Sequence, residues 1–330
     1  YEKQNPGYTG GVKALLRVLL IVSGLIALSA FLTSLIAARR LYVRTGGDGE
    51  IRDYHFSLYL PGYDSAFFAG IIEGAERAAA EISAGISLHS IDPALNELEM
   101  ASYTGVDGVI VCPYLDDALA RRQLEKLDER KIPAVLINHN IPNDKPWPFI
   151  GTNNFDLGRR IGLISRNLSG EPVRPAVVYS SKAPGIYAER ELVEMGIAAA
   201  LGGKLSGPVR SFRTSLNPLD AEALLYRLFM PPEDGEFAVN TLIFTDPADT
   251  AAAAQTLVDM NLVGSIQIIG FGSSPVVLES IRKGIIHCSV AINSERIGYE
   301  AVKSLAALKA TGYTSTSIDT GIDIITRSSL

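Results

Sequence analysis

The chain has few of the side chains from which disulfide frameworks and metal sites are built. Its 330 residues include two cysteines, four histidines and one tryptophan. Two cysteines can form neither a disulfide framework nor, alone, a four-ligand zinc site. The histidines lie without metal-ligand spacing, at His55, His89, His139 and His287. We therefore expect no metal and no cofactor, and we expect Cys112 and Cys288 to be reduced thiols packed in the core.

Motifs of the common enzyme classes are also missing. The sequence contains no G-x-S-x-G, no P-loop, no H-E-x-x-H and no G-x-G-x-x-G. We therefore predict that the protein is not an enzyme and has no catalytic residues. An enzyme that acts on a small polar substrate is the alternative from another class of function.

Positive charge is scarce outside the N-terminal segment. Residues 1–52 hold seven Lys and Arg against three Asp and Glu, whereas residues 53–330 hold 23 against 33. An acidic body argues against nucleic acid as a partner, because binding through phosphates needs Lys and Arg. With 47% hydrophobic and 20% charged residues, the composition is that of a packed globular chain, and the length suggests two domains.

One long segment has no charge at all. The 21 residues from Val18 to Ala38 are uncharged. As a helix this run would span about 30 Å, the thickness of the hydrocarbon core of a bilayer. We predict a transmembrane anchor over 18–38, a cytoplasmic stub over 1–17 and a linker over 39–52. A cleaved signal peptide, whose apolar region is about 7–15 residues long, and a buried core helix are the alternatives.

After the linker, strand-like and helix-like segments alternate in two series. The expected strands cover 55–60, 86–91, 108–112 and 134–138 in the first series, and 176–180, 208–212, 241–245 and 267–271 in the second. The expected helices cover 68–82, 119–131, 156–168, 187–201, 219–230 and 248–261. A helix between successive strands favours right-handed crossovers and parallel sheets. We therefore predict an α/β fold with two doubly wound αβα lobes.

The residues that directly follow the strands are the candidate ligand contacts, because ligands of such lobes bind beyond the carboxyl ends of the strands. The first strand is followed by Asp64, Ser65, Phe67 and Phe68. A helix start explains Asp64 or Ser65 as an N-cap. It explains two adjacent phenylalanines less well, since neighbouring positions on a helix do not face the same core.

Polar residues follow two further strands. Asn138 and His139 come after the strand at 134–138, where they are either turn formers or residues that bind a ligand. Asp246 comes after the strand at 241–245, which is the matching place in the second lobe. Together these positions predict a small-molecule site at the carboxyl edges of the two sheets.

Several stretches occur in an order typical of one family. Among them are LPGYDSAFFAGIIEGAERAAAE (60–81), GVDGVIVCP (105–113), KIPAVLINHNIP (131–142), IGTNNFDLGRRIG (150–162) and DTGIDIITR (319–327). In these motifs the chain resembles the type 1 periplasmic solute-binding proteins of the ribose- and galactose-binding kind. They share their fold with the sugar-binding domain of a superfamily of transcriptional repressors. The resemblance covers about residues 53–330.

The resemblance implies two lobes joined by a three-segment hinge, preceded in this chain by one transmembrane helix. The crossings between the lobes would fall near Gly151–Asn154, Val290–Ser294 and Thr320–Gly321. The first lobe would comprise 53–152 and 291–320, and the second lobe 153–290 and 321–330. The repressors carry a DNA-binding motif before this body, where this chain has its apolar run, so a DNA-binding regulator is not expected.

The resemblance also implies a set of ligand contacts. They are Ser65, Phe67, Phe68, Asn138, His139, Arg190 and Asp246. In an open cleft we expect the side chains of Arg190 and Asp246 to be solvated. Two positions depart from the family, because Gly272 replaces an aspartate and Ile292 replaces a glutamine. In the family, that aspartate and that glutamine bind sugar hydroxyls, so the identity of the ligand stays open.

These features predict a membrane-anchored, extracytoplasmic solute-binding protein with a single pass through the cell membrane. Its lobes would close on a small polar, carbohydrate-like ligand that contacts both of them. The sequence does not choose between two partners in the membrane, which are an ABC-type permease for uptake and a sensor histidine kinase for signalling.

Overall fold

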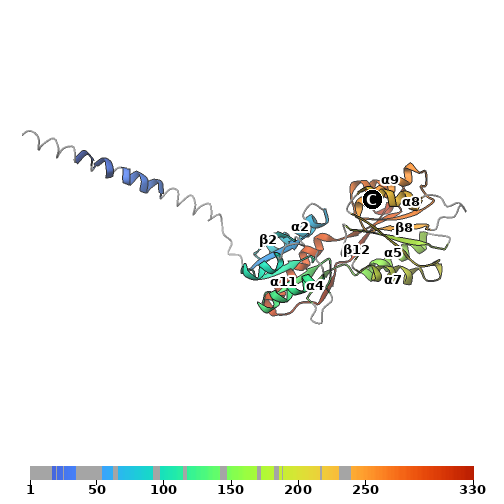
Figure 1. Ribbon diagram of the computed structural model, residues 1–330, viewed down its shortest axis with the longest axis horizontal. Coiled ribbons are helices and arrows are strands. Elements are labelled where there is room, and N and C mark those ends of the chain that lie inside the picture. Colours follow the sequence, from blue (N-terminus) through green and yellow to red (C-terminus); the bar gives the residue numbers. More distant parts are fainter. Residues whose placement is uncertain are drawn as a thin grey trace, which may run out of the picture. The chain divides into compact units, whose positions relative to one another are not determined.

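The computed structural model describes residues 17–19, 21–24, 26–34, 54–61, 66–91, 97–113, 117–141, 147–168, 172–181, 186–187, 189–215, 218–229 and 239–330. The chain divides into two compact units, Tyr1–Arg52 and Asp53–Leu330. In the first unit, the described residues between Arg17 and Ser34 are helical and have a mean hydropathy of 1.9 (Figure 1). By length and composition this helix could cross a membrane.

The second unit contains two α/β lobes, and each lobe is built on one sheet (Figure 1). In the described part of the first lobe, the sheet has the strand order β11-β5-β4-β3-β1-β2, and every pair is parallel. Its strands are β1 (Tyr54–Leu60), β2 (Ala84–Ser90), β3 (Gly108–Val111), β4 (Ala134–Ile137), β5 (Phe149–Gly151) and β11 (Ser317–Asp319).

Helices cover both faces of this sheet. They are α2 (Ala66–Glu81) and α11 (Ser294–Thr311) on one face, and α3 (Glu97–Met100) and α4 (Asp117–Glu129) on the other. Side chains alternate along each strand. Phe56 and Leu58 of β1 therefore pack under α2 and α11, whereas Tyr59 packs against the opposite layer.

The second lobe repeats this plan with one antiparallel strand at its edge. Its strands are β6 (Pro175–Ser180), β7 (Arg210–Thr214), β8 (Thr241–Phe244), β9 (Gln267–Phe271), β10 (Cys288–Ile292) and β12 (Ile322–Thr326). They follow the order β12-β10-β9-β8-β6-β7, and β12 runs antiparallel to β10. The covering helices are α5 (Asn154–Leu168) and α7 (Arg190–Leu201) on one face, and α8 (Pro218–Phe229), α9 (Pro247–Asp259) and α10 (Pro275–Arg282) on the other.

Short 3₁₀ helices complete the described elements, at Ala101–Tyr103, Gly202–Lys204 and Arg327–Ser329. The predicted pair of doubly wound lobes is confirmed. Strand β7 begins at Arg210, so its predicted start at 208 was two residues early. The three-residue strand β5 was not predicted, because so short a run carries no measurable alternation.

The chain crosses between the two sheets at three places that lie side by side. The crossings follow β5, β10 and β11. The backbone N–H of Thr320 donates to Gly151 O at 2.9 Å, and that of Asn153 donates to the Asp319 carboxylate at 3.2 Å. Arg296 of α11 donates to Thr320 O at 3.4 Å. Hydrogen bonds therefore tie the crossings to one another.

Candidate ligand-binding site

The described candidate residues all follow the carboxyl ends of parallel strands. Phe67 and Phe68 follow β1, Asn138 and His139 follow β4, Arg190 follows β6 and Asp246 follows β8. Asp64 and Ser65 lie outside the described residues. Strands β6 and β8 are neighbours, and β1 and β4 are separated by β3 alone. At about 4.8 Å per strand, the loops of each lobe's candidates begin within about 10 Å of one another.

The two phenylalanines lie in the first turn of α2. Both rings are half-buried and pack against the core under that helix. Their centroids are 5.4 Å apart at an interplanar angle of 69°, an edge-to-face pair. Each ring therefore keeps part of its surface outside the core, at the edge where a ligand would bind.

Asn138 ends β4 in a left-handed conformation, with φ 61°. This conformation suits asparagine better than most residues and turns the chain sharply after the strand. Its side chain forms a hydrogen bond with the buried thiol of Cys112. Burial raises the pKa of that thiol to about 12, and the bond to Asn138 acts in the opposite direction. Asn138 is thus a turn former with a partner inside the fold.

His139 presents one ring nitrogen to an aspartate, and among the described residues its other ring nitrogen has no hydrogen-bond partner. Its Nε2 lies 2.9 Å from the Asp117 carboxylate at the start of α4. Because a carboxylate accepts hydrogen bonds, this contact assigns a proton to Nε2, and in the neutral tautomer that has this proton Nδ1 is an acceptor. Nδ1 is buried and has no hydrogen-bond partner among the described residues. A ligand hydroxyl could donate to it.

Arg190 lies at the start of α7 and stacks on an aromatic ring. Its guanidinium carbon is 5.0 Å from the centroid of Tyr187, and that of Arg213 at the end of β7 is 4.2 Å from the same centroid. The Arg190 side chain is 39% exposed, with a loose ion pair to Glu191 at 3.7 Å. The expectation that Arg190 is solvated therefore agrees with the structure.

Asp246 is the N-cap of α9, and its expected solvation was wrong. Its carboxylate accepts from the backbone N–H groups of Ala248 at 2.9 Å and Asp249 at 3.0 Å. The residue is only 8% exposed. Pro247 occupies the first helical position, which suits proline because no intrahelical bond is lost there. Asp246 therefore orders its own helix, whatever else it binds.

The two departures from the family are explained by packing and backbone geometry. Gly272 has φ 79°, and a Cβ there would lie 2.6 Å from Pro247 Cγ. A larger residue at this position would be strained. Ile292 is half-buried, packs against the cores of both lobes and pairs with Ile322 of β12. Both residues thus serve the fold where the family places ligand contacts.

A further polar link was not singled out from the sequence. The Asn154 amide donates to the Glu189 carboxylate at 2.9 Å, which joins the start of α5 to the residue before Arg190. Asn154 and its neighbour Thr152 follow β5, so the rule of polar residues after strands would have found them. The rule failed here only because β5 was not recognised as a strand.

Both cysteines are buried away from solvent. Cys112 and Cys288 are buried free thiols. Burial raises the pKa of Cys288 to about 12, which keeps it protonated and unreactive. Within the described residues, no group of three or more His, Cys, Asp and Glu side chains is arranged to hold a metal ion.

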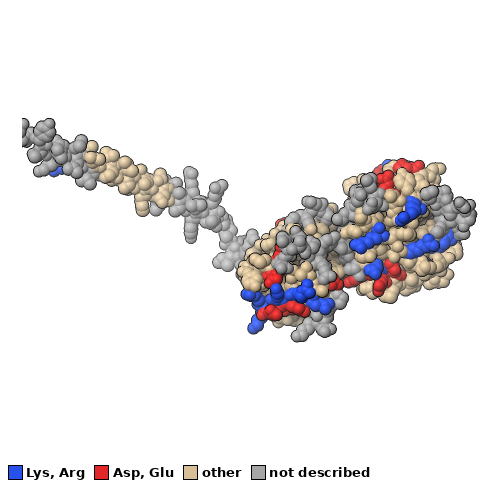
Figure 2. All heavy atoms as spheres, in the orientation of Figure 1, with Lys and Arg blue, Asp and Glu red and all other residues tan. Residues whose placement is uncertain are grey.

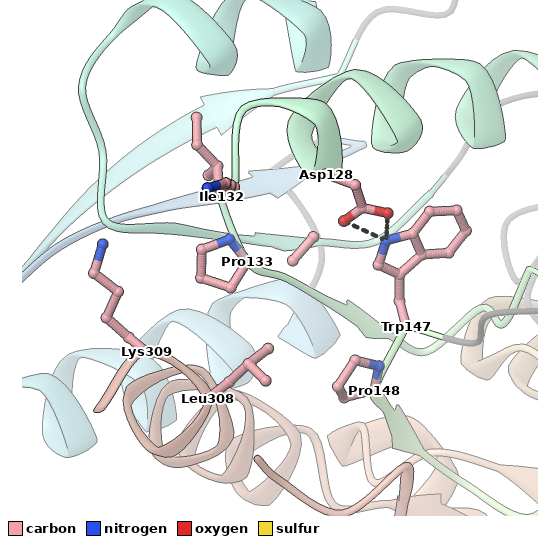
Figure 3. A pocket seen from close by; sticks show the side chains of 9 residues that line it. Asp128, Ile132, Pro133, Trp147, Pro148, Leu308 and Lys309 are labelled. Atoms are coloured by element: carbon pink, nitrogen blue, oxygen red, sulfur yellow. Dashed lines mark hydrogen bonds between the residues drawn. The ribbon is translucent and has the colours of Figure 1, made fainter. Parts of the chain in front are cut away.

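A concavity of about 430 Å³ lies at the other edge of the first sheet (Figure 3). It is lined by Asp128, Lys131, Ile132, Pro133, Ala134, Trp147, Pro148, Leu308 and Lys309. Ala134 begins β4 and Pro148 precedes β5, so the concavity faces the amino ends of the strands. Trp147 donates to the Asp128 carboxylate from its indole N–H at 3.1 Å. None of the candidate ligand contacts lines this concavity.

Charged side chains are mixed on the surface. On the face shown in Figure 2, Lys and Arg lie in small groups interspersed with Asp and Glu over both lobes.

The second unit has two α/β lobes joined by three adjacent crossings, with polar and aromatic residues beyond the carboxyl ends of the strands. This architecture is that of a two-lobed solute-binding domain of type 1. The chain belongs to the periplasmic binding protein domain family, whose model matches residues 56–313. Members of this family bind solutes and are not enzymes. No curated protein matches the chain in sequence.

Solved structures share the fold at low sequence identity. GanP, a glucose-galactose binding protein from Geobacillus stearothermophilus, is 22% identical with a TM-score of 0.71, over 84% of this chain and 98% of that one. A periplasmic ribose ABC transporter protein from Conexibacter woesei is 18% identical with a TM-score of 0.70, over 83% and 92%. A solute-binding protein from Burkholderia graminis in complex with D-arabinose is 16% identical with a TM-score of 0.71, over 84% and 96%.

Proposed function

We propose that this protein binds a small polar solute of the sugar kind between its two lobes, outside the cytoplasm. The observation that carries the proposal is the pairing of aromatic surface with a hydrogen-bond acceptor on one edge of the first lobe. Phe67 and Phe68 offer partly exposed rings, and His139 offers a buried Nδ1 that has no hydrogen-bond partner in the described part of the chain. A sugar has an apolar ring face and hydroxyl donors, which such a set recognises.

The second lobe supplies groups that would complete the site. The half-exposed Arg190 can donate to ligand oxygens. It begins α7 in the connection after β6, and the neighbouring strand β8 is followed by Asp246. Structural relatives described as binding glucose and galactose, ribose or D-arabinose support the same class of ligand. Contacts from both lobes would favour the closed arrangement, because only a ligand that binds one state better shifts the equilibrium.

A thermal-shift screen of the full chain tests this function. The panel would contain D-galactose, D-ribose, D-arabinose and D-allose, with amino acids as the contrasting class. A sugar present at 100 times its dissociation constant should add about 2.7 kcal/mol to the free energy of unfolding. Arg190→Gln should weaken that stabilisation, whereas Arg210→Gln, at the exposed amino end of β7, should leave it unchanged. No stabilisation by any sugar would contradict the proposed function.

We also propose that the apolar helix tethers the domain to the cell membrane in a single pass. Support comes from the length and hydropathy of the helix between Arg17 and Ser34. The tether would consist of a stub over 1–17, an anchor over 18–38 and a linker over 39–52. The lobes would comprise 53–152 with 291–320, and 153–290 with 321–330.

We propose an ABC permease as the membrane partner, which would accept the solute for uptake. Several structural relatives are described as parts of ABC transporters, which supports this choice. A sensor histidine kinase is the second candidate, favoured by the apolar helix, because a permanently tethered binding protein suits a fixed sensor complex. Co-purification of the full chain from native membranes distinguishes the two partners.

A further inference from the structure

Within the part of the chain that the structure describes, three polar side chains at the crossings between the lobes are buried and lack some of their hydrogen bonds. Thr152 is 8% exposed, Asn154 is 5% exposed and Thr320 is 3% exposed. The hydroxyl oxygens of Thr152 and Thr320 and the amide oxygen of Asn154 have no hydrogen-bond partner among the described residues. Buried polar atoms are nearly always paired in native proteins, so each exception calls for a cause.

These side chains belong to one small region. Strands β5 and β11 are parallel neighbours, with Gly151 opposite Asp319. The N–H of Thr320 continues this ladder by donating to Gly151 O at 2.9 Å. The next pair in register is therefore Thr152 and Thr320, on strands about 4.8 Å apart. Asn154 follows two residues later in the same crossing.

The region adjoins the candidate ligand contacts. Thr152 and Asn154 lie beyond the carboxyl end of β5, the edge of the sheet that also carries His139 after the neighbouring strand β4. The Asn154 amide nitrogen is bonded to Glu189, which immediately precedes Arg190. The crossings thus connect the candidate contacts of the first lobe with those of the second.

The chemistry of the three atoms specifies what could satisfy them. A threonine hydroxyl both donates and accepts hydrogen bonds, whereas the Asn154 amide oxygen only accepts. A suitable partner must offer donors and acceptors on closely spaced atoms, as the adjacent hydroxyls of a polyol do. Gly272 and Ile292 supply no polar side chain to such a ligand, so its hydroxyls need partners elsewhere in the cleft.

We propose that Thr152, Asn154 and Thr320 form the polar floor of the ligand site and bind adjacent hydroxyl groups of a sugar or polyol. This inference rests on the proposed function and assigns three residues to it. In the absence of ligand, the two threonine hydroxyls and the Asn154 amide oxygen form no hydrogen bond with the described residues and do not stabilise the fold. When the lobes close on the ligand, its hydroxyls satisfy them.

The first arm of the test uses the unliganded full chain. Thr152→Val and Thr320→Val keep the shape of the side chain and remove the unpaired hydroxyl. Both variants should melt at or above the wild-type temperature, because an unsatisfied polar group is lost. The matched control is Thr256→Val. Thr256 is 3% exposed, and its hydroxyl donates a hydrogen bond to Ala252 O at 2.9 Å. This control should melt below the wild type.

The second arm measures sugar affinity by calorimetry, with D-galactose, D-ribose, D-arabinose and D-allose as probes. For the sugars that bind the wild type, Thr152→Val and Thr320→Val should weaken binding about tenfold or more, equal to about 1.4 kcal/mol. Thr256→Val should bind like the wild type.

The outcomes separate this inference from the function on which it rests. Wild-type sugar binding that both variants retain overturns the polar floor and leaves the proposed function intact. Variants that melt well below the wild type also overturn the floor, because their hydroxyls must then have been paired. A wild type that binds none of the sugars overturns the proposed function, and the polar floor with it.

Discussion

Asp246 caps α9 by accepting hydrogen bonds from two backbone N–H groups. The same carboxylate is one of the proposed ligand contacts, and its several lone pairs would allow it to accept from a ligand as well. A loss of binding on mutation therefore has to be separated from a loss of helix order.

We expect Asp246→Ala to lower the free energy of unfolding by about 1 kcal/mol, the usual cost of losing an N-cap side chain. Asp246→Asn is the matched control, because asparagine caps helices equally well, and it should unfold like the wild type. Urea denaturation of both variants checks this. Equal stability of Asp246→Ala and the wild type would show that the cap contributes nothing.

His89 makes stability depend on pH. Burial against Tyr59, whose ring is stacked on it at 4.7 Å, lowers the pKa of His89 below its usual value of 6.5. The charge of His55 acts in the same direction, and that of Glu97 acts against it. The folded state therefore binds fewer protons than the unfolded state, and stability falls as the pH drops below about 6.5.

His89→Gln should flatten this fall in the free energy of unfolding between about pH 7 and pH 5. Denaturant unfolding at several pH values measures it. His55→Gln should reduce the fall only in part, because His89 still titrates in that variant but has lost the charge of His55. An unchanged slope in His89→Gln would assign the pH dependence to other groups.

At the scale of elements, both lobes bring two helices into close contact through glycine. A Cβ added at Gly298 of α11 would meet the carbonyl of Ile71 in α2, and one added at Gly196 of α7 would meet that of Phe155 in α5. The contact is between backbones, so a flexible side chain cannot move aside. The two helix pairs thus depend on the absence of a side chain at these positions.

Gly298→Ala should destabilise the protein by about 1–3 kcal/mol, the typical cost of overpacking a core. Gly203→Ala is the matched control, because a Cβ there meets nothing within 4 Å. It should change the free energy of unfolding by no more than about 0.5 kcal/mol. Thermal or urea unfolding measures both, and a neutral Gly298→Ala would mean that α2 and α11 can separate without cost.

The pattern of elements could be predicted from the sequence wherever a segment was long enough to show its period. The apolar run of β8 predicts a strand, and the helical spacing of apolar residues in α4 predicts a helix. Strand β5 could not be predicted because three residues show no period. The sequence predicted which candidate residues follow the ends of strands. It did not predict the cap formed by Asp246, and it left the turn made by Asn138 as one of two alternatives, because both depend on local backbone geometry.

At the scale of the whole molecule, the anchor is the first claim to test. Full-length protein should remain in the membrane fraction after an alkaline wash, because a span of about 20 apolar residues is released only by detergent. A body starting at Arg52 should be soluble and monodisperse. Recovery of a soluble mature form that begins near Ala30 would instead show that the segment is a cleaved signal peptide.

Closure of the lobes on a sugar is the central claim, and small-angle scattering of the body tests it most directly. Three adjacent crossings allow a hinge, because hinge motion needs only a few residues that absorb backbone rotation. With a sugar at a concentration shown by calorimetry to saturate the site, the radius of gyration should fall below that of the unliganded body. Identical scattering curves with and without the saturating sugar would contradict the account.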